Sequence, residues 1–168
     1  MRIKGITFED FANYKLPSMF IVSVSCDWKC CKESRIPDVC QNKNLTDGET
    51  INIGDDALYT IFITNDITKA VVIGGLEPML QFNEVVSLIE YFRSHNTDCP
   101  FVIYTGYNES EIEDKVTHLS KFSNIIIKFG RFIPDRKTIF DPVLGVNLAS
   151  DNQYAKQISP PAKGAVNI

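Results

Sequence analysis

Four short apolar runs, spaced along the chain, constrain its fold more than any other feature. They cover residues 18–25, 70–75, 99–106 and 124–130 and are rich in β-branched and aromatic residues. Continuous runs of this kind are typical of strands that are buried on both faces of a sheet. The sequence therefore predicts four buried strands.

The segments between these runs have the patterns of helices. Helices are expected at residues 54–65, 82–96 and 108–122. In the second, apolar residues recur every three or four positions, and Asn83 is the expected N-cap. The third opens with Asn108 and has Glu111 three residues later, a pattern related to the capping box. Strands that alternate with helices predict right-handed βαβ units, so the expected fold class is α/β with a parallel sheet.

Length and composition suit a single compact domain that is not built for nucleic acid. The chain has 168 residues, 44% of them hydrophobic, and 21 acidic against 17 basic residues without a basic stripe,. We expect an α/β domain over residues 1–158 and an extended or disordered tail over 159–168, which is rich in Pro and small residues. The chain starts without a secretion-signal pattern and has no apolar run of membrane-spanning length, so we expect a cytoplasmic protein with no membrane partner.

Four of the five cysteines follow the first predicted strand, at Cys26, Cys30, Cys31 and Cys40. In a reducing compartment, such a group binds metal or does redox chemistry more often than it forms disulfides. Three thiolates suit an iron-sulfur cluster that keeps one iron free, and four suit a closed zinc site. Consecutive side chains diverge, so one of Cys30 and Cys31 is an expected bystander, which favours three ligands. Spacing alone leaves the cluster, zinc and plain buried thiols open.

Two further motifs fall where predicted strands end, which is where ligands bind in parallel sheets. In "GGLEP" (74–78), Gly74 and Gly75 allow a ligand to approach the backbone, and Glu77 offers an acceptor for a ligand ammonium,. A plain strand-to-helix turn explains this motif equally well. Thr105 and Gly106 end the third strand and lie at the same expected edge of the sheet.

Six short motifs occur along the chain in one order. They are "MFIVSVSC" (19–26), "CDWKC" (26–30) with "CQN" (40–42), "GGLEP" (74–78), "IYTGY" (103–107), "FGRF" (129–132) and "ASDNQ" (149–153). In this ordered set the chain resembles the radical S-adenosylmethionine (SAM) enzymes. Within them it is most similar to the activating protein family of anaerobic ribonucleoside-triphosphate reductase.

The chain departs from that family's pattern inside the cysteine loop. Nine residues separate Cys30 from Cys40, where the family has two, which gives an atypical CxxxC-x9-C loop. Cys40 matches the third ligand best because "QN" follows it, as "HN" does in the family. Val39 stands at a position that is often aromatic and near the adenine, and Leu76 is an extra residue within "GGLEP".

The resemblance implies a parallel-stranded partial (β/α) barrel with a [4Fe-4S] cluster on Cys26, Cys30 and Cys40, Cys31 being the alternative ligand. The iron without a cysteine would chelate the amino and carboxylate groups of SAM. The implied SAM-binding residues are Val39, Gly74, Gly75, Glu77, Thr105 and Gly106. No catalytic side chain is implied beyond the cluster and SAM.

The implied activity is formation of the glycyl radical on the large subunit of anaerobic (class III) ribonucleotide reductase, with a flavodoxin or ferredoxin as electron donor. Lys29 is a candidate for contact with that acidic donor and Arg131 for contact with SAM or substrate, and each is also explained as an ordinary surface charge. Two other functions stay open. One is a radical SAM enzyme acting on another protein or a small molecule, and the other is a non-catalytic zinc or iron-sulfur binding module.

Overall fold

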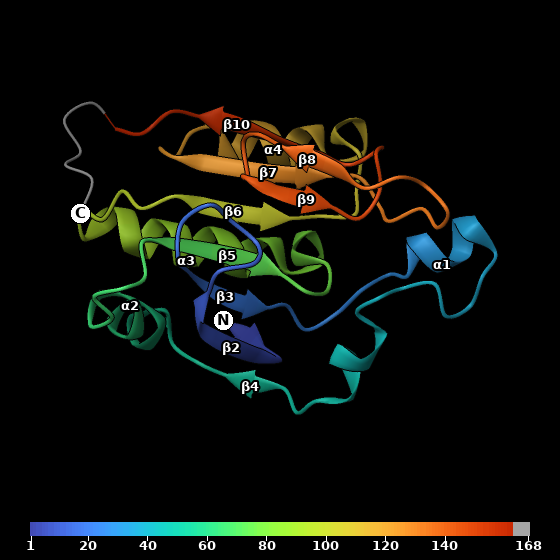
Figure 1. The fold of residues 1–168 in the computed structure, drawn as a ribbon. Helices are drawn as coiled ribbons and strands as arrows, with labels where there is room; N and C mark the ends of the chain where they lie inside the picture. The colour runs from blue at the N-terminus through green and yellow to red at the C-terminus, as the bar shows by residue number, and fades with distance from the viewer. Residues whose placement is uncertain (163–168) are drawn as a thin grey trace.

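Four parallel strands form the centre of a six-stranded sheet with the order β10-β7-β6-β5-β3-β2, as Figure 1 shows. The parallel strands are β3 (Ser18–Val22), β5 (Ala70–Gly74), β6 (Phe101–Tyr104) and β7 (Ile125–Phe129). Each overlaps one of the four predicted runs. The structure, a computed structural model, describes residues 1–162.

The two outer strands are antiparallel to their neighbours and were not expected from the sequence. β2 (Gly5–Asp10) pairs with β3, and β10 (Tyr154–Ser159) pairs with β7. Both are largely polar or exposed and lack the apolar run that marks a central strand. β10 includes the first residue of the expected tail. Residues 160–162 have no regular secondary structure, and the rest of that tail lies outside the described residues.

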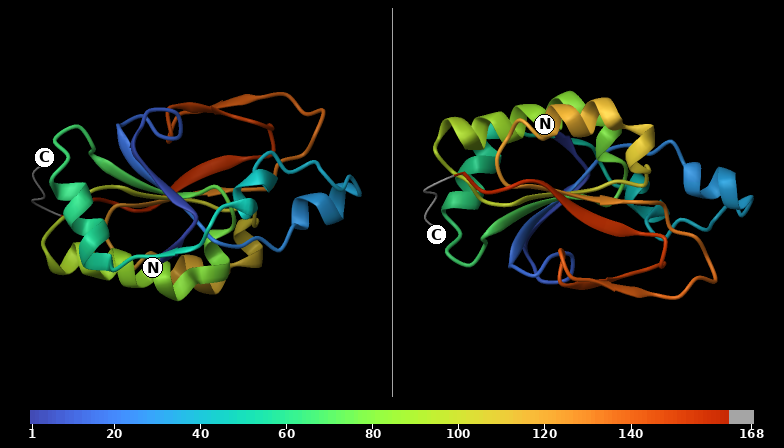
Figure 2. Two further views of the ribbon diagram at one scale, coloured as in Figure 1. Left: turned by 90° about the horizontal axis from the view of Figure 1, so that it is seen from below. Right: turned by 90° about the horizontal axis from the view of Figure 1, so that it is seen from above.

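The three long helical segments cover one face of the sheet (Figure 2). They are α2 (Asp55–Ile63), α3 (Phe82–Ser94) and α4 (Glu113–Leu119). The prediction of Asn83 as the N-cap of α3 is wrong, because the 3₁₀ helix η2 (Pro78–Gln81) runs directly into α3 and Gln81 takes the cap position. The third expected helix is divided into the 3₁₀ helix η3 (Glu109–Glu111) and α4. At its start Asn108 N–H donates to Glu111 Oε2 at 2.8 Å, as the capping pattern predicted.

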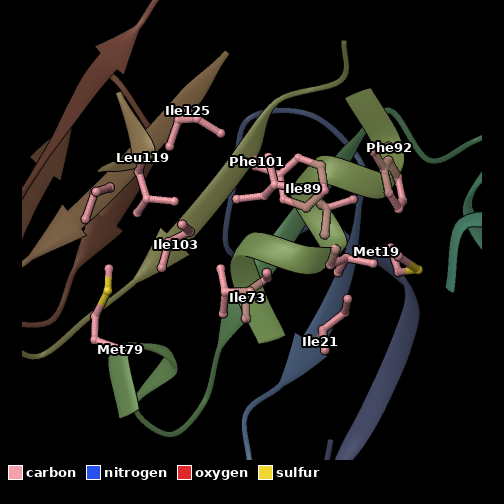
Figure 3. Packing of buried hydrophobic residues seen from close by; sticks show 14 of the residues in the cluster. Met19, Ile21, Ile73, Met79, Ile89, Phe92, Phe101, Ile103, Leu119 and Ile125 are labelled. Carbon is pink, nitrogen blue, oxygen red and sulfur yellow. The ribbon is translucent and has the colours of Figure 1, made fainter. Parts of the chain in front are cut away.

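The main hydrophobic core lies between these helices and the sheet (Figure 3). Alternate strand residues face it, among them Ile73 of β5 and Ile103 of β6, and Phe92 of α3 is fully buried against them. Successive side chains of a strand point to opposite faces, so the intervening residues face away from the helices. Val72, Val102 and Ile126 accordingly belong to a second, smaller core.

Residues 11–17 and an antiparallel hairpin cover the second face (Figure 2). The hairpin joins β8 (Ile139–Asp141) to β9 (Val146–Leu148). The two covers meet where Lys15 N–H donates to the Leu144 carbonyl at 2.7 Å. They close the second face over part of its length and leave it open toward the carboxyl ends of the parallel strands, where the cysteine loop lies.

The cysteine loop extends beyond the carboxyl ends of the parallel strands (Figure 1). It contains α1 (Lys29–Ser34) and the 3₁₀ helix η1 (Lys43–Asp47), and it leads to β4 (Ile51–Asn52), which pairs with β1 (Arg2–Ile3). Within the part of the chain that the structure describes, every helix falls short of the length and apolarity that crossing a bilayer demands.

Candidate functional site

A pocket of about 560 Å³ opens at the carboxyl ends of the parallel strands. Most of the residues predicted for the site line it: Cys26, Cys30, Cys40, Gly75, Glu77, Thr105 and Gly106. The structure thus brings together segments that are far apart in the sequence. Three residues predicted for the site, Cys31, Val39 and Gly74, are not among those that line the pocket.

Cys30 and Cys31 are neighbours on one helix, and they differ in their access to the pocket. Trp28 has the left-handed conformation (φ 60°) and turns the chain into α1, which carries both thiols. The Cys26 sulfur accepts the Trp28 N–H at 3.4 Å. The sulfur atoms of Cys30 and Cys31 are 3.9 Å apart, yet only Cys30 lines the pocket. This arrangement favours the prediction that Cys31 is the bystander.

Two of the pocket thiols, Cys26 and Cys30, are held in their protonated form. Burial raises the pKa of Cys26 to about 11 and that of Cys30 to about 12, with the neighbouring Cys40 adding to the second shift. Because the thiolate is the metal ligand, binding of a metal here releases protons. No three Cys, His, Asp or Glu side chains of residues 1–162 lie close enough together to hold one ion. The three thiols suit a cluster, in which each thiolate binds a different iron, better than a closed single-ion site.

Glu77 is a buried carboxylate with one unused acceptor position. It is 4% exposed, and its Oε1 accepts from Thr105 Oγ1 at 2.7 Å and from Met79 N–H at 3.0 Å. Its Oε2 accepts from Gly106 N–H at 2.8 Å. A carboxylate has about four acceptor positions, so Oε2 keeps one for a ligand. Burial raises the pKa of Glu77, and the hydrogen bonds from Thr105 and Gly106 oppose that shift.

The two glycines of the "GGLEP" turn are explained by packing. A Cβ on Gly75, whose φ is +77°, would lie 2.9 Å from Val22 Cγ1, and one on Gly74 would lie 2.9 Å from Tyr104 Cβ. Both distances are too short for any larger residue. Glu77 N–H donates to the Ser25 carbonyl at 2.8 Å and so ties the turn to the start of the cysteine loop. The glycines therefore position Glu77 beside that loop.

A chain of polar contacts fixes the first part of the cysteine loop to the domain. Tyr107 OH donates to Asp27 Oδ2 at 2.7 Å, and Lys29 Nζ lies 4.3 Å from the centre of the Tyr107 ring. Lys29 also forms an ion pair with Glu111 at 2.8 Å. Asp27 and Glu111 were not predicted for the site, since only the fold brings Asp27 to Tyr107 and Glu111 to Lys29.

Arg131 extends this network to α1. It is 8% exposed and forms ion pairs with Glu111 at 2.7 Å and with Glu33 at 3.2 Å. The hydrogen bonds from Arg131 lower the pKa of Glu111 to about 2. Lys29 and Arg131, the two candidate contact charges, are both occupied within the domain. They position the loop that carries Cys26 and Cys30.

Tyr107→Phe is expected to loosen the loop while leaving the domain nearly as stable. The change removes one hydrogen bond, worth about 0.5–1.5 kcal/mol, from a contact that only the loop needs. Amide hydrogen exchange of residues 27–34 should become faster, and exchange in β5 and β6 should not change. Tyr91→Phe is the control, because no hydrogen bond of the Tyr91 hydroxyl is found within residues 1–162. Equal exchange in both variants would show that Asp27 does not anchor the loop through Tyr107.

Lys128 is a buried cation that the sequence analysis did not identify. It lies on β7, lines the pocket, is 7% exposed and donates from Nζ to the Gly130 carbonyl at 2.6 Å. Gln153 Nε2 donates to the same carbonyl at 3.1 Å. Burial lowers the pKa of Lys128 to about 8, against the opposing effect of the Glu77 carboxylate. The only sign in the sequence is a lysine that interrupts an apolar run.

Lys128→Met is expected to stabilise the domain at pH 7. The folded-state pKa lies below that of the unfolded chain, so wild-type stability rises as the pH increases from about 8 to about 10.5,. At neutral pH the buried charge of Lys128 lowers the free energy of unfolding by up to about 3 kcal/mol, because a change of one pKa unit corresponds to about 1.36 kcal/mol. Urea unfolding should give Lys128→Met a higher free energy of unfolding than the wild type at pH 7. At pH 10.5 this difference should disappear. An advantage that is independent of pH would refute the buried charge as its cause.

Comparisons with known proteins give one result, at the level of the family. No curated protein and no solved structure matches the chain. A family model described as a 4Fe-4S single cluster domain matches residues 18–153. The match runs from the start of β3 to Gln153 and so includes the whole cysteine loop and Glu77. This family indicates a [4Fe-4S] cluster as the cofactor. The chain therefore belongs to the 4Fe-4S single cluster domain family.

Proposed function

We propose that the protein is a radical SAM enzyme whose [4Fe-4S] cluster is held by Cys26, Cys30 and Cys40. One observation carries the proposal. The three thiols line the same pocket as Glu77, a buried carboxylate with one acceptor position left. A cluster with three protein ligands needs a further ligand, and a nearby carboxylate suits the N–H groups of the amino group that SAM would present there. The family match supports the cluster and does not extend to SAM.

The residues around the pocket have distinct roles in this proposal. The bound cofactors supply one-electron cleavage of SAM and removal of a hydrogen atom from the substrate. Glu77 would accept a hydrogen bond from the SAM amino group, while Thr105 and Gly106 hold the carboxylate in place. Apolar side chains, including Phe20 and Leu148, line other parts of the pocket and limit access of water to the reactive centre,.

The proposed substrate is the class III ribonucleotide reductase, on which the enzyme would generate the glycyl radical with electrons from a flavodoxin or ferredoxin. The order of the six sequence motifs supports this assignment. The four parallel strands, with helices on one face, are compatible with a partial (β/α) barrel of radical SAM type. A second candidate is a radical SAM enzyme with a small-molecule substrate, which the buried cation Lys128 in the pocket favours.

Release of 5′-deoxyadenosine tests the SAM chemistry. The protein is reconstituted anaerobically with iron and sulfide, reduced and incubated with SAM, and the nucleoside is quantified by chromatography. We expect product from the wild type and from Cys31→Ala, and none from Cys40→Ala. Absence of product from a wild-type sample that contains the full cluster would refute the proposal. Stoichiometric zinc without a chromophore would instead support the binding-module alternative.

A glycyl radical signal tests the proposed substrate. Reduced protein, SAM and a class III reductase are combined, and the radical is sought by electron paramagnetic resonance. A signal that requires SAM and is absent with Cys40→Ala would support the activase. Release of 5′-deoxyadenosine without a radical on the reductase would favour the small-molecule candidate.

A further inference from the structure

The pocket continues from the cysteine loop along the second face of the sheet. Its far part is lined by Asn13, Tyr104, Lys128, Asn147, Leu148 and Gln153. These residues come from β6, β7, β9 of the hairpin, residues 11–17 and the turn before β10, none of which carries a cysteine of the site. In the sheet order, β7 is three strands from β3, which leads to Cys26. At about 4.8 Å per strand, the two strands are about 14 Å apart.

Lys128 is the one basic side chain in this far part of the pocket, and its ammonium group is incompletely satisfied. Among residues 1–162, its Nζ makes no ion pair with a carboxylate, and it has one hydrogen bond, to the Gly130 carbonyl. An ammonium has three N–H donors, so two remain. A buried cation without a partner is costly. The buried Arg131 and the half-buried Arg93, by comparison, each have a carboxylate partner.

The surroundings of Lys128 suit the anionic end of a small ligand. The Gly130 carbonyl accepts from both Lys128 and Gln153 and thereby holds the ammonium at one place on the pocket wall. The Lys128 ammonium lies 6.0 Å from the centre of the Tyr104 ring, which gives this wall an apolar surface beside the charge. The SAM carboxylate has its own place at the cluster in the proposed mechanism, so it does not require Lys128.

We infer that the far part of the pocket is a second ligand subsite, in which Lys128 binds the carboxylate or phosphate group of a small-molecule substrate. The subsite itself is independent of the radical chemistry, and only its description as a substrate site rests on the second candidate of the proposed function, the radical SAM enzyme with a small-molecule substrate. The ligand would place its anionic end at Lys128 and the remainder toward the cysteine loop. Such a ligand spans the pocket between the two groups of functional residues.

Binding of inorganic phosphate and of succinate to the reconstituted protein tests the subsite. Both anions are titrated while the amide resonances of Gly130 and Gln153 are followed by NMR. We expect saturable shifts in the wild type with at least one of the two anions, and at least tenfold weaker binding in Lys128→Met. Lys128→Arg, which keeps the charge, should retain binding. Lys137→Met, which removes an exposed lysine of the same region, is the matched control.

Several outcomes would overturn this inference. One is that the wild type and Lys128→Met bind the anions equally well. Another is that neither anion causes a saturable shift in the wild type. Competition between phosphate and SAM, together with weaker SAM binding in Lys128→Met, would assign Lys128 to SAM and also overturn it. The 5′-deoxyadenosine assay on the same samples keeps the two proposals apart. Anion binding that depends on Lys128 in a protein that does not cleave SAM would retain the subsite and refute the radical chemistry.

Discussion

Alanine at Cys26, Cys30 or Cys40 is expected to abolish the iron-sulfur chromophore of the reconstituted protein, whereas Cys31→Ala should retain most of it. The first three thiols line the pocket and Cys31 does not. Loss of one thiolate leaves a second iron without a protein ligand, and an incompletely held cluster exchanges with solvent. The loss should be nearly complete for each of the three variants.

Iron and sulfide analysis and visible absorption measure this result. Cys99→Ala is the matched control for loss of a thiol, because Cys99 packs against the main core, outside the pocket. Circular dichroism should show that all five variants remain folded. Loss of the cluster in Cys31→Ala and its retention in Cys30→Ala would reverse the ligand assignment. Equal cluster content in Cys40→Ala and the wild type would remove Cys40 from the ligand set.

Glu77→Gln is expected to suppress 5′-deoxyadenosine formation and to destabilise the domain. An amide nitrogen in place of Oε2 faces the Gly106 N–H, so two donors oppose each other where a hydrogen bond now exists. An unsatisfied buried donor costs about 1–3 kcal/mol. The amide also removes the negative charge and one acceptor for the amino group that SAM would present. SAM should therefore bind at least tenfold more weakly in the proposed enzyme.

Thr105→Val separates these two effects. It removes the donor to Glu77 and the acceptor of the Tyr107 N–H, and it keeps the size of the side chain. Glu77 retains its charge and its contacts with Met79 and Gly106. We expect a stability loss of about 1–3 kcal/mol for the two hydrogen bonds, with 5′-deoxyadenosine formation largely preserved. Stability is measured by urea unfolding and SAM binding by equilibrium dialysis. Normal SAM cleavage by folded Glu77→Gln would show that this carboxylate serves the turn and not the cofactor.

The central part of the fold was predictable because its signals are local. Each parallel strand is a continuous apolar run, and such runs are recognisable without knowing their partners. The outer strands β2 and β10 gave no such signal, since their pairing partners, not their composition, make them strands. The N-cap of α3 was misplaced for a related reason. The 3₁₀ turn before the helix continues into it, and Gln81 is held there by contacts with Val24 and Arg2.

The candidate site was predictable to the extent that it follows from strand ends. Cys26 and Glu77 come shortly after predicted strands and Thr105 stands at the end of one, and parallel strands bring their carboxyl ends to one edge of the sheet. Arg131 could not be assigned in the same way. Whether it contacts a ligand or pairs internally depends on Glu33 and Glu111, which approach it only in the folded chain.

The sequence by itself therefore determined the four central strands, the edge of the sheet at which the candidate site lies and the residue types available there. Hydrophobic periodicity and the succession of strands and helices along the sequence are properties of the chain alone. The tertiary structure decided which side chains share the pocket. Cys30 and Cys31 are neighbours on α1, and only Cys30 lines the pocket. The pairing of β7 with β6 and β10, under the cover of the hairpin, leaves Lys128 buried. Burial and ion pairing arise from contacts between distant segments, and no local pattern encodes them.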